Sequence, residues 1–203
     1  MREKMASGTP WYIRANAVSV DLNRNYDADF DSVDYSYNLS SADYRSPTYR
    51  GPYANSEPET QAVLSFLSDI NPNALFSYHC LACISDDEFL TSKKVKTSKE
   101  SYQKVNEIYA EYSNGFRDAL NLNRRENLVV KPTCSAGSLP EFLYNKGVIA
   151  FDVELSFTIE DFLVCRYDKT TPKILQKCIL GHTGGIKKVI EYFSKNSFIA
   201  KES

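Results

Sequence analysis

The feature that most constrains the fold is an apolar run at residues 148–155, VIAFDVEL, in which only Asp152 and Glu154 carry charge. A run of this kind, rich in β-branched and aromatic residues, is typical of a buried central strand. A second short run at residues 74–78, ALFSY, leads to His79 and has the same character. These short strands alternate with helical segments, and this alternation predicts an α/β fold.

The helical segments show apolar side chains at intervals of three and four residues, as expected for helices that bury one face. The first helix begins at Ser56, where a serine N-cap is followed by Pro58 in the first turn and by Glu59 at the capping-box position. It ends before Asn71-Pro72. We predict helices at residues 56–70, 93–120 and 138–144 and a last helix after Gly185, extended segments at residues 13–22 and 128–131, and a long surface loop at residues 23–56.

Charge and composition exclude several classes of protein. The chain has 24 Lys and Arg against 26 Asp and Glu, a net charge of −2, so it lacks the cationic field that nucleic-acid or membrane-surface binding needs. We therefore expect no nucleic-acid partner and no membrane partner. Five cysteines in a chain that can build its own core favour reduced thiols, which indicates a cytoplasmic protein from the chain as given. Without a repeat or a linker, residues 1–203 are expected to form a single domain.

Polar residues stand at the ends of the predicted strands in three places: residues 21–25 (DLNRN), His79 and Glu154. In an open α/β sheet the carboxyl ends of the strands converge on one crevice, where ligands bind. These residues are therefore candidates for one site. The alternative is structural, with Glu154 as a buried, paired carboxylate, His79 as a hydrogen-bonded core histidine, and the loop as the place of a surface salt bridge.

Four segments, in the same order along the chain, resemble the zinc metallocarboxypeptidases of the carboxypeptidase A/B and D/E/N types and their bacterial relatives. They are residues 20–26 (VDLNRNY), residues 49–60 with Tyr-Arg-Gly-Pro and Ser-Glu-Pro-Glu-Thr, residues 76–79 (FSYH) and residues 151–155 (FDVEL). The resemblance implies a mixed, mostly parallel sheet flanked by helices. It also implies a zinc-dependent hydrolase that removes C-terminal residues from peptides.

The resemblance implies substrate contacts for four residues. Asn23 and Arg24 match the pair that holds the terminal carboxylate of the peptide, a task that suits the planar donors of a guanidinium group. Arg14, nine residues before Asn23, matches the arginine that stabilises the oxyanion. Leu139 falls near the position that sets side-chain preference, and an apolar residue there argues against a preference for basic C-terminal residues.

The resemblance also implies a catalytic base and a metal ligand. Glu154 matches the general base, which takes a proton from zinc-bound water and later gives it to the leaving amine. His79 matches the third zinc ligand. The family takes its other two ligands from a His-x-x-Glu motif upstream of DLNRN, and neither His79 nor His182, the two histidines of this chain, is followed by Glu three residues on. A catalytic zinc needs three protein ligands, so the ligand set is incomplete in this chain.

Two further hypotheses follow from that incomplete set. In the first, the chain is a non-catalytic module that binds a peptide C-terminus or an amino acid after loss of the metal site. In the second, the chain is a partial domain without the family's N-terminal part, and it buries an exposed sheet edge by forming a homo-oligomer. Members of the family are often secreted, so the compartment stays open.

Overall fold

The computed structural model describes residues 14–31, 40–79, 88–122, 129–132, 135–154 and 171–196. These residues form two compact units, each made of two stretches of the chain. Unit 1 comprises Met1–Pro72 and Cys134–Lys146, and unit 2 comprises Asn73–Thr133 and Gly147–Ser203. The assignment of residues 1–203 to a single domain stays a prediction.

Unit 2 contains a sheet whose four strands have the order β1-β4-β2-β3. The strands are β1 (Ala74–His79), β2 (Glu88–Thr91), β3 (Val129–Pro132) and β4 (Ile149–Glu154). The β1–β4 and β2–β3 pairs are parallel and the β2–β4 pair is antiparallel. The predicted mixed, mostly parallel sheet is confirmed, and β4 is the buried interior strand that the run VIAFDVEL indicates.

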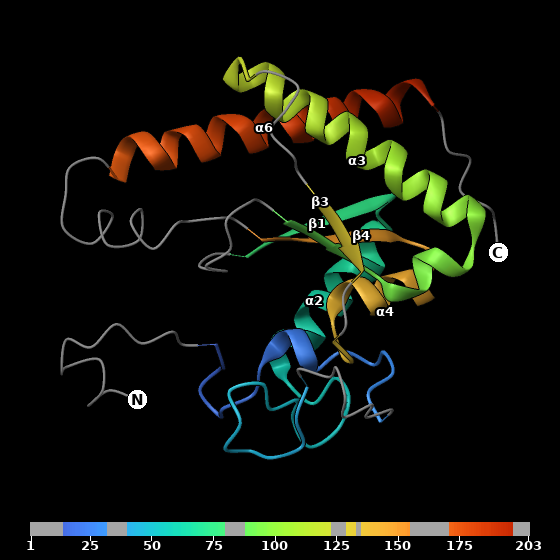
Figure 1. Ribbon diagram of the computed structural model, residues 1–203. Coiled ribbons are helices and arrows are strands. Elements are labelled where there is room, and N and C mark those ends of the chain that lie inside the picture. The colour runs from blue at the N-terminus through green and yellow to red at the C-terminus, as the bar shows by residue number, and fades with distance from the viewer. Residues whose placement is uncertain are drawn as a thin grey trace. The chain divides into compact units, whose positions relative to one another are not determined.

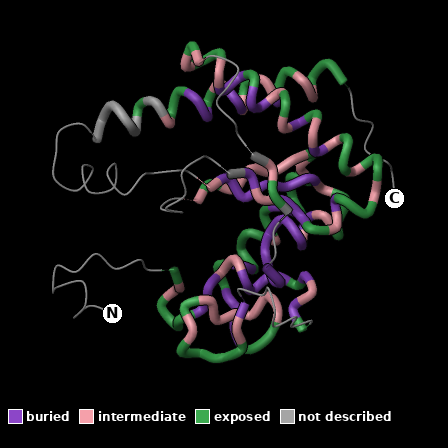
Figure 2. Tube along the Cα trace, in the orientation of Figure 1, coloured by how far each residue is buried: buried purple, intermediate pink, exposed green. Residues whose placement is uncertain are grey.

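Helices α3 (Lys99–Leu120) and α6 (Thr171–Lys195) lie side by side over one face of this sheet (Figure 1). The core between sheet and helices is aromatic. The Phe76 ring stacks on Tyr112 and Phe151 at centroid distances of 5.1 and 5.2 Å, and Phe89 meets Tyr112 edge-on at 4.9 Å. Buried positions are concentrated on β4 and on the facing sides of these two helices (Figure 2). Successive side chains of a strand point to opposite faces of the sheet. Phe76 of β1 and Phe151 of β4 therefore lie on the face that α3 and α6 cover.

The predicted start of the last helix is wrong. Helix α6 begins at Thr171 and passes through Gly181, Gly184 and Gly185 without a break. The cause is the close approach of α3, since a Cβ atom on Gly184 would lie 2.4 Å from the carbonyl oxygen of Gly115. These glycines allow two helices to pack backbone to backbone, at a cost in helix propensity that the packing offsets.

Three other predictions about unit 2 need correction. The predicted helix at residues 93–120 is two elements, the 3-10 helix η2 (Lys93–Thr97) and α3, because Ser98 caps α3 by accepting a hydrogen bond from Ser101 N at 3.2 Å. Strand β2 has four residues and was not predicted. Strand β1, predicted to be buried, is half-exposed and lies at the edge of the described sheet. The homo-oligomer through this edge stays a prediction.

Unit 1 contains η1 (Leu22–Arg24), α2 (Pro58–Ile70) and α4 (Leu139–Asn145). The strand predicted at residues 13–22 is wrong for its described part, residues 14–22. Asn16 accepts hydrogen bonds at its side-chain oxygen from the main-chain nitrogens of Val18 and Val20, at 3.2 and 2.9 Å. Such local bonds compete with strand pairing and produce a turn instead.

Helix α2 matches its predicted range, but its burial differs from the expectation. Its N-cap is Glu57, and Ser56 instead donates its hydroxyl to Glu57 Oε1 at 2.6 Å. Of the predicted apolar face, Leu67 is buried, whereas Val63, Phe66 and Ile70 are among the exposed hydrophobic residues, with Phe66 61% exposed. The loop predicted at residues 23–56 begins within η1, which ends at Arg24. Its other described residues, 25–31 and 40–56, hold no helix or strand, yet they bury several side chains, including Tyr26 and Phe30.

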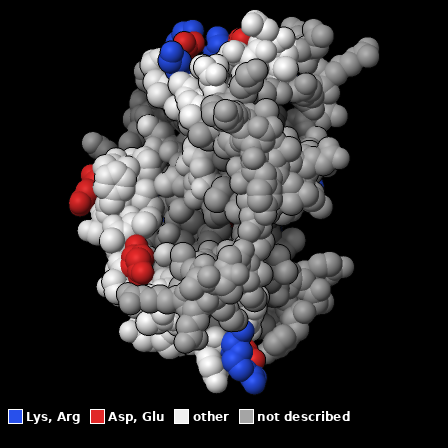
Figure 3. All heavy atoms as spheres, turned by 90° about the vertical axis from the view of Figure 1, so that its left-hand side faces the viewer, with Lys and Arg blue, Asp and Glu red and all other residues white. Residues whose placement is uncertain are grey.

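On the face shown in Figure 3, charged side chains of the described residues lie in small separate groups, some with basic and acidic atoms next to one another and some acidic alone. Asp43 and Arg45 form an exposed ion pair, with a distance of 2.8 Å between Asp43 Oδ2 and Arg45 Nη2. None of the helices that the structure describes is both long and apolar enough to cross a membrane.

Candidate carboxylate-binding and catalytic site

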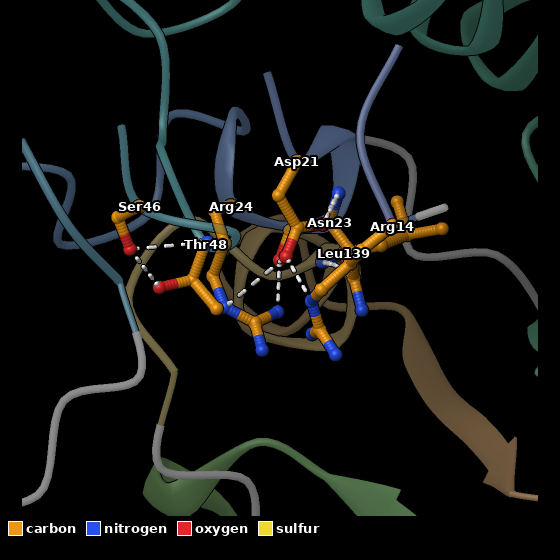
Figure 4. A network of polar contacts seen from close by, with 7 residues as sticks. All are labelled: Arg14, Asp21, Asn23, Arg24, Ser46, Thr48 and Leu139. Atoms are coloured by element: carbon orange, nitrogen blue, oxygen red, sulfur yellow. Dashed lines mark hydrogen bonds and ion pairs between the residues drawn. The ribbon is translucent and has the colours of Figure 1, made fainter. Parts of the chain in front are cut away.

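A buried carboxylate, that of Asp21, forms the centre of the polar network in unit 1 (Figure 4). The Asp21 main-chain nitrogen donates to the carbonyl of Tyr49 at 2.8 Å. Asp21 Oδ1 accepts from the Asn23 main-chain nitrogen at 3.2 Å, which makes Asp21 the N-cap of η1. The main chain of Asp21 is therefore fixed by Tyr49, and its side chain is fixed by the main chain of Asn23.

Two guanidinium groups meet the other oxygen of this carboxylate. Arg14 Nε lies 2.5 Å from Asp21 Oδ2, and Arg24 Nε lies 3.9 Å from the same atom. The Arg14 side chain is 32% exposed, whereas that of Arg24 is 5% exposed. Two guanidinium charges against one carboxylate leave one positive charge in the network, which favours a single anionic group as a ligand.

The backbone of Arg24 is fixed by a turn that comes from much later in the chain. Gly137 has a φ of +72°, and a Cβ atom there would lie 1.9 Å from the carbonyl oxygen of Arg24. Tyr26 N donates to Gly137 O at 3.0 Å, and Gly137 N donates to Ala28 O at 2.8 Å. Glycine therefore permits both the turn and the close approach to Arg24.

Asn23 connects this network to α4. Its side-chain oxygen Oδ1 accepts a hydrogen bond from the main-chain nitrogen of Leu139 at 2.9 Å. Leu139 is the first residue of α4 and is buried. The structure thus brings Arg14, Asn23, Arg24 and Leu139 together in one unit, while the part of Leu139 in side-chain preference stays a prediction.

Asn25, the last residue of the DLNRN motif, is completely buried and has a structural task. Its Nδ2 donates to the carbonyls of Arg50 and Tyr53 and to Ser56 Oγ, at 2.8, 3.2 and 2.9 Å. Its Oδ1 accepts from Glu57 N at 3.2 Å. One side chain therefore joins the first two segments that carry the family resemblance.

His79 and Glu154 lie side by side in unit 2, because they are register partners at the carboxyl ends of the parallel strands β1 and β4. His79 Nε2 lies 3.3 Å from Asp152 Oδ1 and 3.1 Å from Ser77 Oγ. A carboxylate behind an imidazole orients the ring and selects its tautomer. Since Nε2 faces Asp152, a metal ion would bind His79 through Nδ1.

The donor set for a metal is incomplete in the part of the chain that the structure describes. No group of three or more His, Cys, Asp and Glu side chains there is placed to hold a metal ion. A catalytic zinc site has three protein ligands and one open position. His79 stays a predicted ligand and zinc a predicted cofactor.

Comparison with known proteins gives the family. The sequence profile described as zinc carboxypeptidase matches residues 3–175, which is most of the chain, and the chain belongs to this family. Murein peptide amidase A of Escherichia coli K12 is 39% identical over 79 residues, which cover 36% of this chain and 32% of that protein. The chain therefore spans about a third of the length of this curated relative.

Solved structures show the fold. Bovine thrombin-activatable fibrinolysis inhibitor, in complex with tick carboxypeptidase inhibitor, superposes with a TM-score of 0.65 at 19% identity, over 92% of this chain and 61% of that chain. Carboxypeptidase A from Helicoverpa armigera gives a TM-score of 0.64 at 17% identity, over 85% of this chain and 41% of that chain. The predicted carboxypeptidase-like fold is confirmed.

Sequence reasoning gave no role to two residues of these networks, Asp21, which it included among the candidates at residues 21–25, and Asp152, which it did not include. Asp21 is the first residue of DLNRN, but nothing local indicates that its carboxylate lies between two arginines. Asp152 had a usable signal, since it is two residues before Glu154 in a strand and two-residue spacing places both on one face. Its register partner Ser77 is likewise two residues before His79.

Proposed function

We propose that the chain carries the substrate-binding and general-base residues of a peptidase or amidase that hydrolyses the last bond of a peptide with a free C-terminal carboxylate. The observation that carries the proposal is the network of Arg14, Asn23 and Arg24 around Asp21. The family and the relative named murein peptide amidase support a peptide substrate.

The residues of unit 1 bind and orient the substrate. Arg24 and Asn23 donate hydrogen bonds to the terminal carboxylate, and the planar guanidinium of Arg24 meets both of its oxygens. Arg14 donates to the carbonyl oxygen of the bond that breaks, where negative charge develops during attack. One such donor typically lowers the barrier by about 3 kcal/mol.

Glu154 supplies the proton transfers. Its carboxylate accepts a proton from the attacking water and donates it to the leaving amine, so the products are an amino acid and a shortened peptide. Its neighbour in the register is His79, whose ring Asp152 orients. Bound zinc would add Lewis-acid activation of the water, as the family implies.

Cleavage of matched peptides tests this function. The full chain is incubated, with and without added Zn²⁺, with a short peptide that ends in a free carboxylate and with its C-terminal amide, and mass spectrometry detects the released residue. We expect release from the carboxylate peptide, abolished by Glu154→Gln. Arg24→Ala should weaken binding of this peptide roughly thirtyfold, since a hydrogen bond to a charged group contributes about 2 kcal/mol. Equal binding of both peptides before and after Arg24→Ala would contradict the proposal.

A binding module is the second candidate. The observation in its favour is that the residues proposed to hold the carboxylate lie within unit 1 and contact one another there. Under this alternative, the carboxylate peptide binds and depends on Arg24, but no residue is released and Glu154→Gln changes nothing.

A further inference from the structure

The side-chain amide of Asn23 is held by a main-chain donor 116 residues away in sequence. The distance between Leu139 N and Asn23 Oδ1 is 2.9 Å. A main-chain N–H can only donate, so the end of the amide that faces it must be the oxygen. This contact therefore determines the orientation of the Asn23 amide, and it turns the donor end, Nδ2, away from α4.

The donor is itself held in place by buried residues. Ser138, directly before Leu139, is completely buried, and Leu139 is 7% exposed. Gly137 exchanges main-chain hydrogen bonds with Tyr26 and Ala28. An amide anchored to such a rigid group loses little further freedom when it binds a ligand, and preorganisation of this kind strengthens binding.

We propose that the main-chain N–H of Leu139 is a positioning group that makes the site selective for a carboxylate over a carboxamide. This inference rests on the proposed function, in which Asn23 contacts the terminal group of the peptide. The locked Asn23 amide presents only N–H donors to that group, and so does the guanidinium group of Arg24.

A carboxylate only accepts hydrogen bonds and satisfies these donors, whereas a terminal carboxamide would bring its own NH₂ against them. The charge of the network acts in the same direction. Arg14 and Arg24 exceed the single carboxylate of Asp21 by one positive charge, which a terminal carboxylate neutralises.

The first test compares two substitutions at one position of the full chain. Leu139→Pro removes the main-chain N–H at the first helical residue, where proline is tolerated. Leu139→Ala keeps this N–H and removes the side chain. Calorimetry measures the affinity for a short peptide with a free C-terminal carboxylate and for its amide. Loss of the Leu139 side chain changes the affinity for both peptides alike, because both end in the same residue, so the ratio of the two affinities in Leu139→Ala should equal that of the parent. In Leu139→Pro this ratio should fall about tenfold.

Each contrary outcome has a separate meaning. An unchanged preference in Leu139→Pro, or an equal loss in both variants, overturns the inference alone. A parent chain that prefers neither peptide contradicts the proposed function, and the inference falls with it.

Hydrogen exchange of the Leu139 amide tests the contact without the proline substitution, and so serves if Leu139→Pro does not fold. The amide should be protected in the parent and in Asn23→Asp, which keeps an acceptor oxygen, and unprotected in Asn23→Ala. Asn23→Asp should also lose binding of the peptide with a free C-terminal carboxylate, because the substitution replaces the N–H donors by a negative charge. Equal exchange rates in the parent and Asn23→Ala overturn the inference.

Discussion

Gly137→Ala should lower the free energy of unfolding by about 3 kcal/mol or more, because two costs combine at this position. The φ of +72° is strained for any residue with a Cβ atom. The new Cβ would also overlap the carbonyl oxygen of Arg24, at 1.9 Å, and the neighbouring carbonyl carbon, at 2.5 Å. Both atoms are backbone, so they cannot rotate away. Urea unfolding measures the loss.

Gly147→Ala is the matched control for this prediction. Gly147 has a similar φ of +79°, but no atom lies within 4 Å of the Cβ position. This variant carries the backbone strain without the overlap, so it should lose only about 1 kcal/mol. If both variants lose the same free energy, the close approach of Gly137 to Arg24 is wrong.

Asp21→Ala should destabilise the chain by about 3 kcal/mol, because it removes the carboxylate against which the nearly buried Arg24 guanidinium lies. It should also weaken binding of the peptide with a free C-terminal carboxylate, since Arg14 and Arg24 lose the group that holds them. Chemical denaturation gives the first effect and calorimetric titration gives the second. Asp21→Glu, which keeps the charge, should recover part of both.

The exposed pair Asp43–Arg45 provides the control for Asp21. Its distance of 2.8 Å is shorter than the 3.9 Å between Asp21 and Arg24, but the side chains of Asp43 and Arg45 are 46% and 74% exposed. The hydrogen bond from Arg45 lowers the pKa of the Asp43 carboxyl. Because solvent screens this exposed pair, it contributes little to stability, and Asp43→Ala should leave the unfolding curve nearly unchanged. An effect of Asp21→Ala no larger than that of Asp43→Ala would contradict the central place of Asp21.

Local patterns predicted most of the sheet and two helix ranges. The strands and extended segment at residues 74–78, 128–131 and 148–155 and the helices at residues 56–70 and 138–144 correspond to β1, β3, β4, α2 and α4 within a few residues. In these segments, runs of apolar residues and proline positions act over short distances, so a single sequence carries enough information.

The errors have a distant cause in one segment and a local cause in another. Glycine at 181, 184 and 185 suggests a helix boundary, and the residues of α3 that face these glycines, Gly115 among them, explain why α6 continues. The alternation Val18, Val20, Leu22 suggests a strand, and the Asn16 side chain turns this segment instead.

The candidate site also has some residues that the sequence indicates and some contacts that only the structure shows. The resemblance identified Asn23, Arg24 and Arg14 as neighbours, and the structure gives a physical reason in the carboxylate of Asp21. The contact of Leu139 N–H with Asn23 joins residues 116 positions apart, which no local pattern reveals. His79 and Glu154 are adjacent because of strand register, another long-range property.

The central claim is that Arg24 and Asn23 bind the terminal carboxylate of a peptide. A crystal structure of the chain with a bound peptide that has a free C-terminal carboxylate tests it most directly. The account predicts the carboxylate against Arg24 and Asn23, with N–H donors directed at its oxygens. A peptide whose carboxylate lies away from Arg24 and Asn23 would contradict the account.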